Sequence, residues 1–299
     1  MRVTNIALVL VAVIGCGATA CNQDRAIATE AMNKGLQELS GGSQQEALEL
    51  LKQAANADST YADPPYYVGL TYHERYNEHE RAQDFYKRAL ERDPQNAQFL
   101  YKLGTVQAMQ GKHDDAVASF TKATKTVPRF AKAWFRLGLA LRADKKYLKA
   151  AEAYGASIEV DPTMKVTEDD QGGAAFHELG DLYLRFRLYD RAEQVYDEGI
   201  KFNPAVARLH RGKGLAQVKQ KKHPEAIATF TKALELEPGN ESAYFNLAVA
   251  QEAAGQVEAA IATLTKYESM ATDFGRQVAA NAMRTKLEGS RQAREEPEK

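Results

Sequence analysis

Two histidines among carboxylates are the residues of this chain most able to do chemistry. His73 and His79 lie close in sequence to Glu74, Glu78 and Glu80. Imidazole and carboxylate groups together are a common ligand set for zinc. If these five side chains converged, they would form a metal site.

The position of His79 recurs along the chain, which argues against that site. The slot holds, in turn, His79, His113, Tyr147, Tyr189 and His223. Metal ligands need convergent geometry, and equivalent positions of successive repeats are spread along a chain. We therefore expect framework histidines, and we predict no metal and no cofactor.

The sequence contains no catalytic or phosphate-binding motif. GxxxxGK[ST], GxSxG, CxxC and HExxH are all absent from it. The 39 basic and 40 acidic side chains nearly balance, whereas a nucleic-acid-binding protein usually has a basic excess. We predict a protein that is not an enzyme and does not bind nucleic acid.

Both cysteines lie near the N-terminus, in a segment typical of export. Residues 1–15 contain Arg2 and the apolar run Ile6–Ile14, which is too short to span a membrane as a mature helix. Val13-Ile14-Gly15-Cys16 resembles a bacterial lipobox, and that resemblance implies cleavage before Cys16 and lipid on the new N-terminal cysteine. Cys21 is the alternative lipidation site, and an ordinary cleaved signal is the other alternative.

The residue after the lipidated cysteine bears on the membrane that keeps such a protein. Gly17 follows Cys16, and Asn22 follows Cys21; neither is the aspartate that typically retains lipoproteins at the inner membrane. The resemblance thus implies an anchor in the outer membrane, facing the periplasm. We expect residues 16–27 to be the lipidated N-terminus and a linker.

The rest of the chain follows one spacing, which any functional residues must share. An alanine recurs at steps of 34 or 35 residues, with one step of 42. In six of the repeats a glycine precedes this alanine by about twelve residues, and Ala248 takes its place in the seventh; a bulky residue follows the alanine by four. The alanines are Ala47, Ala82, Ala116, Ala150, Ala192, Ala226 and Ala260. Such a period is typical of an array of repeats.

Each repeat is predicted to contain two amphipathic helices. Within 97–130, apolar residues recur at helical spacing on both sides of a turn at Gly111. Pro128 ends the second helix because proline cannot donate a backbone hydrogen bond and clashes with the preceding turn. No single repeat can bury its apolar face alone, so stacking supplies the core of an all-α solenoid.

These positions resemble the tetratricopeptide repeat family. The best copy is 131–164, with Trp134, Leu137, Gly138, Leu141, Ala150, Tyr154 and Pro162 at the family's spacing. The resemblance implies a right-handed superhelical solenoid of about seven helix pairs over 28–274. The predicted repeats are 28–61, 62–96, 97–130, 131–164, 173–206, 207–240 and 241–274, with an inserted loop at 165–172. We expect a capping helix at 275–288 and a disordered, charged tail at 289–299.

By family geometry, one face of each first helix lines a concave groove. Its predicted residues are Tyr66, Leu70, Tyr101, Thr105, Phe135, Leu139, His177, Arg211 and Phe245. We expect this row to hold an extended or helical segment of a partner; the alternative is that the row serves packing alone. Family domains that clamp chaperone C-termini need a lysine and an asparagine where this chain has Tyr66 and Leu70, so that clamp is absent, although Lys132 and Arg136 match its last pair.

The expected function is therefore a protein-binding scaffold that is anchored to the bacterial envelope. It is similar to the pilotin lipoproteins that assist type IV pilus secretins in the outer membrane, so the expected partner is an envelope protein such as a secretin. The alternatives are a scaffold for a motility, polysaccharide-export or outer-membrane assembly machine, a cell-wall glycan-binding protein, and a factor that recruits an enzyme.

Overall fold

Every regular element in the described part of the chain is an α-helix. The computed structural model describes residues 21–167, 172–272 and 274–295, which contain fifteen helices. The predicted signal peptide, Cys16 and the acidic residues Glu168–Asp170 of the inserted loop lie outside these residues. None of the described helices is long and apolar enough to cross a membrane.

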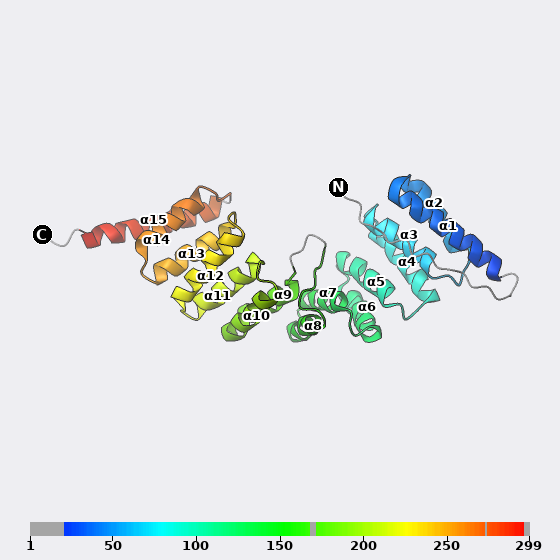
Figure 1. The fold of residues 1–299 in the computed structure, drawn as a ribbon, viewed down its shortest axis with the longest axis horizontal. Helices are drawn as coiled ribbons and strands as arrows, with labels where there is room; N and C mark the ends of the chain where they lie inside the picture. Colours follow the sequence, from blue (N-terminus) through cyan, green and yellow to red (C-terminus); the bar gives the residue numbers. More distant parts are fainter. Residues whose placement is uncertain (1–20, 168–171, 273, 296–299) are drawn as a thin grey trace. The chain divides into compact units, whose positions relative to one another are not determined.

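The chain divides into two compact units (Figure 1). Unit 1 ends at Lys146 and unit 2 begins at Tyr147. Unit 1 contains α1 (Cys21–Gly41), α2 (Gln44–Ala57), α3 (Asp63–Glu74), α4 (His79–Arg92), α5 (Ala97–Met109), α6 (His113–Thr126) and α7 (Ala131–Ala143). Unit 2 contains α8 (Tyr147–Val160), α9 (Ala174–Arg185), α10 (Tyr189–Phe202), α11 (Ala207–Lys219), α12 (His223–Leu236), α13 (Glu241–Ala253), α14 (Val257–Glu268) and α15 (Phe274–Glu295).

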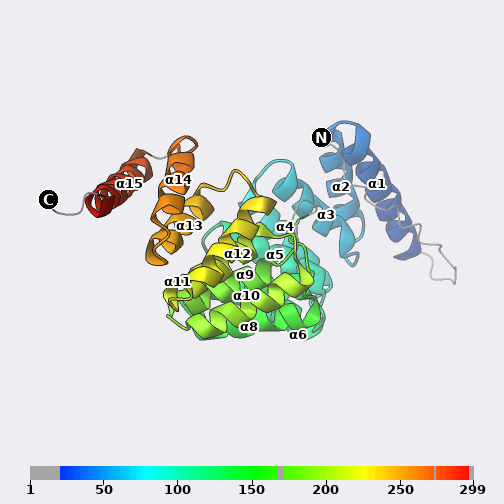
Figure 2. The same cartoon turned by 60° about the vertical axis from the view of Figure 1, so that its left-hand side comes forward.

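Within each unit, consecutive helices pack in sequence order. Figure 2 shows α9 to α12 stacked side by side in unit 2, and α11 contacts both α9 and α13. In unit 1, α5 likewise contacts both α3 and α7. The first helices of successive repeats are thus neighbours, which is the arrangement that the repeat period predicts.

The core follows the predicted spacing. All seven recurring alanines are fully buried, and so are the bulky residues four positions later. These are Leu51, Tyr86, Phe120, Tyr154, Tyr196, Phe230 and Leu264. Because burial of one large apolar side chain contributes about 1.5–3 kcal/mol, this row is the main source of stability in each unit.

Small residues are required where these rings cross a neighbouring helix. The Tyr196 ring of α10 lies between Gly180 of α9 and Gly212 of α11, and a Cβ atom on either glycine would overlap it. Gly180 belongs to the recurring glycines, but Gly212 does not. The second glycine therefore marks a contact between repeats that the period alone does not predict.

The helix bounds differ from the prediction at both ends of the array. Residues 16–27 are predicted to be the lipidated N-terminus and a linker, but the chain is already helical at Cys21, where α1 begins. Arg25 on this extension donates a hydrogen bond to Asp58 at 2.5 Å, and its guanidinium stacks on Tyr61 at 4.3 Å. These contacts hold the extra turns against the loop after α2.

The last helix is also longer than expected. Instead of ending at residue 288, α15 continues through the first part of the predicted disordered tail to Glu295. Ala280 and Leu287 anchor it in the terminal core, and Arg284 bonds both Glu268 and Glu288. The residues beyond 288 are mostly good helix formers, so the helix continues without an apolar face of its own.

Candidate functional site

The predicted groove residues lie on the first helices of six repeats. In unit 1, α3, α5 and α7 carry Tyr66, Leu70, Tyr101, Thr105, Phe135 and Leu139. In unit 2, α9, α11 and α13 carry His177, Arg211 and Phe245. Each unit therefore has its own first-helix face, defined here by these residues.

Aromatic side chains dominate the first-helix face of unit 1, and they pack between repeats. The Tyr66 ring stacks on Phe99 with a centroid distance of 4.6 Å. The ring centroid of Tyr101 lies 5.0 Å from that of Phe130. Burial raises the pKa of Tyr66 to about 12. The Tyr66 ring thus joins α3 to α5, whereas Tyr101 packs against the residue before α7. Both rings are partly buried and leave only part of their surface to a partner.

Two of the predicted groove residues offer almost no surface. Thr105 is 8% exposed and Phe135 is 5% exposed. The Thr105 hydroxyl donates to the Tyr101 carbonyl one turn earlier, at 2.8 Å. The expectation that these two side chains contact a partner is therefore corrected: they contribute to packing, whereas Leu70 and Leu139 remain partly exposed.

A polar cluster that contains His73 and Glu74, two of the residues of the metal hypothesis, lies at the C-terminal end of α3. Lys102 of α5 forms a 2.8 Å ion pair with Glu74, and the Tyr86 hydroxyl lies 3.4 Å from His73 Nδ1. Burial and the positive charge of Lys102 lower the pKa of His73. Within the described residues, no group of three His, Cys, Asp or Glu side chains is arranged to hold a metal ion.

The ion pair between Glu74 and Lys102 was not predicted. Its partners are 28 residues apart, and neither belongs to the recurring framework. The pair could be predicted only by packing the first helices of two successive repeats, α3 and α5, side by side, since each helix supplies one of the two charges.

The first-helix face of unit 2 is more polar, since Phe245 is its only aromatic residue among the three predicted ones. Asp181 lies on α9, one turn after His177. The buried Tyr196 hydroxyl donates to Asp181 at 2.5 Å, and His177 Nε2 lies 3.7 Å from the other oxygen of that carboxylate. Burial and the charge of Asp181 raise the pKa of Tyr196, while the nearby Arg211 guanidinium opposes this shift. The Asp181 side chain still keeps 46% of its surface exposed.

Other basic residues of unit 2 are occupied in different ways. Arg208 donates a 2.5 Å hydrogen bond to the carbonyl of Gly172, which ends the inserted loop. Lys213 pairs with Asp197 at 2.6 Å. Arg208 is therefore a structural residue that holds the loop to α11, whereas the charge of Arg211 acts on the Tyr196 hydroxyl. The remaining predicted residue of this face, Phe245, packs with its ring centroid 5.8 Å from that of Tyr267.

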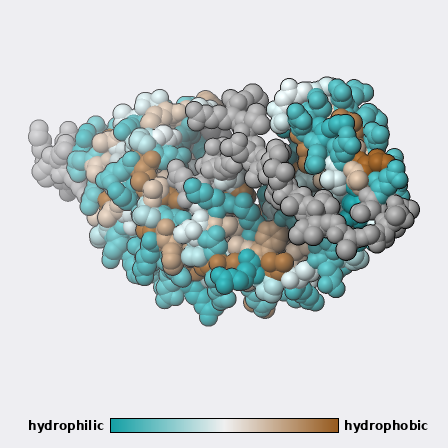
Figure 3. All heavy atoms as spheres, turned by 45° about the vertical axis from the view of Figure 1, so that its right-hand side comes forward, coloured by the Kyte–Doolittle hydropathy of each residue, from teal (hydrophilic) through white to brown (hydrophobic). Residues whose placement is uncertain are grey.

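The surface agrees with a protein that exposes little continuous apolar area. Figure 3 shows mostly hydrophilic residues on the face drawn, with apolar residues in small separate groups. Mean hydropathy is −0.49. Recognition on the first-helix faces would therefore combine a few apolar contacts with directional polar ones.

Comparisons with known proteins agree with the repeat architecture. Sequence models of the tetratricopeptide repeat match residues 69–96, 85–118, 110–163, 177–241 and 217–284. The chain is 27% identical over 176 residues to the Hsp70-Hsp90 organizing protein 1 of Arabidopsis thaliana. That alignment covers 56% of this chain but only 29% of the relative, so the chain spans less than a third of its length.

Solved structures show the same fold. The chain is similar to pilF of Pseudomonas aeruginosa, with 21% identity and a TM-score of 0.57, over 74% of this chain and 96% of that one. It is also similar to YrrB, described as a protein of this repeat type with an unusual peptide-binding site. The identity is 20% and the TM-score 0.54, over 66% of this chain and 96% of that one.

Proposed function

Because the chain belongs to the tetratricopeptide repeat family, we propose that it is a protein-binding scaffold. It holds an extended or helical segment of a partner along its first-helix faces. The observation that carries this proposal is the geometry around Asp181. Its carboxylate accepts a hydrogen bond from a buried tyrosine and lies 3.7 Å from His177 Nε2, yet it remains accessible to a partner.

Such a fixed polar group suits recognition for an energetic reason. A flexible surface carboxylate loses rotamer freedom when it binds, at a cost of about 0.5–1.5 kcal/mol for each immobilised side chain. Asp181 is already ordered by Tyr196, so this cost is largely met on folding. The likeness of the fold to YrrB supports a peptide or an unfolded segment as the class of ligand.

A photo-crosslinking experiment in intact cells tests this proposal. The crosslinker replaces Gln98 of α5 or the equivalent Ser242 of α13, both on first helices. Matched controls place it on the second helices, at the exposed Lys87 of α4 and Gln194 of α10. We expect the same partner to be crosslinked from Gln98 and Ser242 only. A partner crosslinked from the control positions alone would refute binding by the first-helix faces.

We also propose that lipid on Cys16 anchors the scaffold to the outer membrane, facing the periplasm, with Cys21 as the alternative site. The lipobox-like sequence supports this, since stable anchoring needs more than one acyl chain and bacterial lipoproteins carry several. Labelling with palmitate should fail in Cys16→Ser and persist in Cys21→Ser. The reverse pattern would move the site to Cys21, and label in neither wild type nor variant would leave an ordinary export signal.

Within this proposal, the assembly of a type IV pilus secretin is the partner role that we favour. The similarity in fold to pilF over nearly the whole of that chain supports it. Loss of secretin multimers in a deletion strain, restored by wild type but not by Cys16→Ser, is the expected result. Normal secretin assembly in the deletion strain would favour a motility, polysaccharide-export or outer-membrane assembly scaffold instead.

A role as a clamp for chaperone C-termini is not proposed, despite the name of the Arabidopsis relative. Tyr66 and Leu70 occupy the positions where such a clamp needs a basic residue and an amide. Tyr66 is stacked on Phe99, so this part of the face presents no charge to a terminal carboxylate.

A further inference from the structure

A second surface of unit 2 departs from the repeat pattern, at the turn between α9 and α10. The turn has the same backbone as its counterparts: Arg187 has a φ of 59°, and the equivalent Lys221 has 63°. The Leu188 amide donates to the Tyr183 carbonyl at 2.9 Å, as the Lys222 amide does to that of Gln217. The fold therefore sets no special requirement on the side chains at this turn.

The side chains nevertheless differ from those of the equivalent turns. Leu188 occupies the residue before the second helix, where the five other described turns of this kind carry Glu78, Lys112, Lys146, Lys222 and Gln256. Phe186 stands where repeats 3 and 6 have Gln110 and Gln220. Both are well exposed, at 43% for Leu188 and 49% for Phe186.

A third exposed apolar side chain lies on α8, one residue after Tyr147, which contacts this turn. Leu148 on α8 is 77% exposed, and it stands where four other repeats carry Glu80, Asp114, Asp190 and Glu258. An acid at this place favours the first turn of a helix, so leucine forgoes that benefit. The neighbouring Tyr147 ring packs edge-on against Phe186 at 5.4 Å, which joins α8 to the turn.

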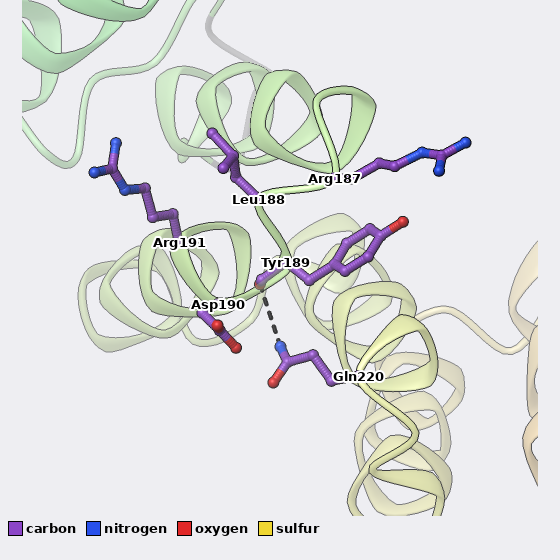
Figure 4. Close-up of a pocket in the computed structure, with 6 residues that line it drawn as sticks. All are labelled: Arg187, Leu188, Tyr189, Asp190, Arg191 and Gln220. Carbon is purple, nitrogen blue, oxygen red and sulfur yellow. Dashed lines mark hydrogen bonds between the residues drawn. The ribbon is translucent and has the colours of Figure 1, made fainter.

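Basic side chains surround this apolar group. The segments 185–191 and 219–222 together carry six basic residues and one acidic residue. Arg185 stacks on Tyr147 at 4.7 Å, while Arg187 and Arg191 are exposed. Figure 4 shows Arg187 and Arg191 extending to opposite sides of the turn. The whole chain has a net charge of only −1, so this is a local concentration of positive charge.

The turn also borders a fixed recess. A cavity of about 380 Å³ is lined by Arg187, Leu188, Tyr189, Asp190, Arg191 and Gln220. Gln220 donates to the Tyr189 carbonyl at 3.2 Å and to Glu193 at 2.9 Å. Lys222 also binds Glu193, at 2.7 Å. These bonds hold Gln220, one of the lining side chains, against the backbone of Tyr189.

We propose that this surface, formed by Leu148, Phe186 and Leu188 with Arg187 and Arg191, is a second docking site for an acidic protein segment that carries bulky apolar residues. The exposed apolar side chains supply anchors and the arginines supply charge complementarity. The recess adds directional polar groups, which favour a protein segment over a fluid lipid surface. This site lies on the turns and not on the first-helix faces, so its test is independent of the scaffold proposal.

The test uses the full-length chain and a fluorescein-labelled amphipathic peptide with leucine and phenylalanine on one face and glutamate elsewhere. The variant Leu148→Asp, Phe186→Gln and Leu188→Lys carries the residues that repeat 3 has at the same places, Asp114, Gln110 and Lys112. It keeps the net charge unchanged and the turn geometry compatible. We expect peptide affinity to fall at least about tenfold, since anchors of this kind carry most binding energy.

A second variant, Arg187→Asn with Arg191→Gln, tests the charge. Asn77 already occupies the equivalent turn position with a φ of 56°, so the fold is preserved. Affinity for the glutamate peptide should fall and lose most of its salt dependence. Circular dichroism should show unchanged helicity and melting for both variants.

Three results would overturn the proposal. The first is equal binding of the glutamate peptide to wild type and to the triple variant. The second is equal or better binding of a control peptide with lysine in place of glutamate. The third is co-sedimentation of wild type, but not the triple variant, with phosphatidylglycerol vesicles while the peptide fails to bind, which would assign the surface to a membrane.

Discussion

Tyr86 in unit 1 and Tyr196 in unit 2 occupy the same repeat position, and both rings are fully buried. Their hydroxyl groups have different partners, however. That of Tyr86 lies 3.4 Å from the imidazole of His73, whereas that of Tyr196 donates to the exposed carboxylate of Asp181 at 2.5 Å. The repeat fixes the ring, and the residue beside its hydroxyl decides the chemistry of the face.

The same difference extends to the neighbouring groove positions. Tyr66 and Tyr101 in unit 1 are partly buried by packing, Tyr66 against Phe99 of the next repeat and Tyr101 against Phe130. Their counterparts in unit 2, His177 and Arg211, are not aromatic, and His177 Nε2 lies 3.7 Å from the exposed carboxylate of Asp181. The first-helix face of unit 1 is thus mainly structural, while that of unit 2 offers fixed charges to a partner.

The largest effect that distinguishes the faces is expected from truncating one residue on each. Tyr66→Ala should destabilise unit 1 by about 3 kcal/mol, since it removes a ring packed on Phe99. Arg211→Ala should cost less, about 1 kcal/mol, because Arg211 is partly exposed and its charge is screened by solvent. Urea denaturation of the full chain measures both. Equal losses would mean that the two faces share one structural role.

A glycine substitution tests the contact that holds the Tyr196 ring. Gly212→Ala should destabilise unit 2 by about 1–3 kcal/mol, since its Cβ overlaps the buried ring. Gly155→Ala is the matched control in the same unit. That position has open space and lies in a helix, so alanine should stabilise it by up to about 1 kcal/mol. Melting temperatures that move in the same direction would contradict the packing described here.

Lowering the pH should reduce the stability of the N-terminal part of unit 1, where Arg25 binds Asp58. Burial disfavours the charged form of Asp58, but hydrogen bonds from Thr60 and Arg25 outweigh it and lower the pKa to about 2, from an ordinary value of 3.8. Because the folded-state pKa is the lower one, the stabilisation is present above about pH 4 and is lost as the pH falls toward 2.

We expect this contribution to be about 1–2 kcal/mol, reduced by the partial exposure of Arg25. The cost of Asp58→Asn, measured by denaturation, should therefore be largest at neutral pH and shrink to nearly nothing at pH 2. A cost that does not vary with pH would show that the ion pair with Arg25 contributes nothing.

The smallest expected effect compares the two tyrosine hydroxyls directly. Tyr196→Phe removes a hydrogen bond to a charged acceptor. It should cost only about 1 kcal/mol, because Asp181 can turn to solvent. Tyr86→Phe should change stability by less than about 0.5 kcal/mol, because a 3.4 Å contact is at the weak limit of a hydrogen bond. The reverse order would break the comparison between the units.

The sequence alone predicted the parts of the molecule that repeat. Seven alanines and seven bulky residues in phase identified the buried row, and Gly111 and Pro128 correctly marked a turn and a helix end. These features were predictable because each repeat meets the same packing problem at the same position.

The features outside the repeat were harder to predict. The N-terminal extension of α1 depends on Arg25 reaching Asp58, 33 residues away, and no local pattern encodes that contact. Thr105 and Phe135 were placed in the groove by analogy between repeats, but each is buried by its own neighbours. Leu148, Phe186 and Leu188 did carry a signal, since each breaks the polar pattern of its equivalents, yet comparison of the turns was needed to see it.

The most direct test of binding by the first-helix faces is hydrogen exchange of the full chain with and without its crosslinked partner segment. We predict protection of backbone amides in α9 and α11, where Asp181 and Arg211 lie, with weaker protection in α3 and α5. The second helices α4, α6, α10 and α12 should exchange unchanged. Protection confined to those second helices would contradict a scaffold that binds through its first helices.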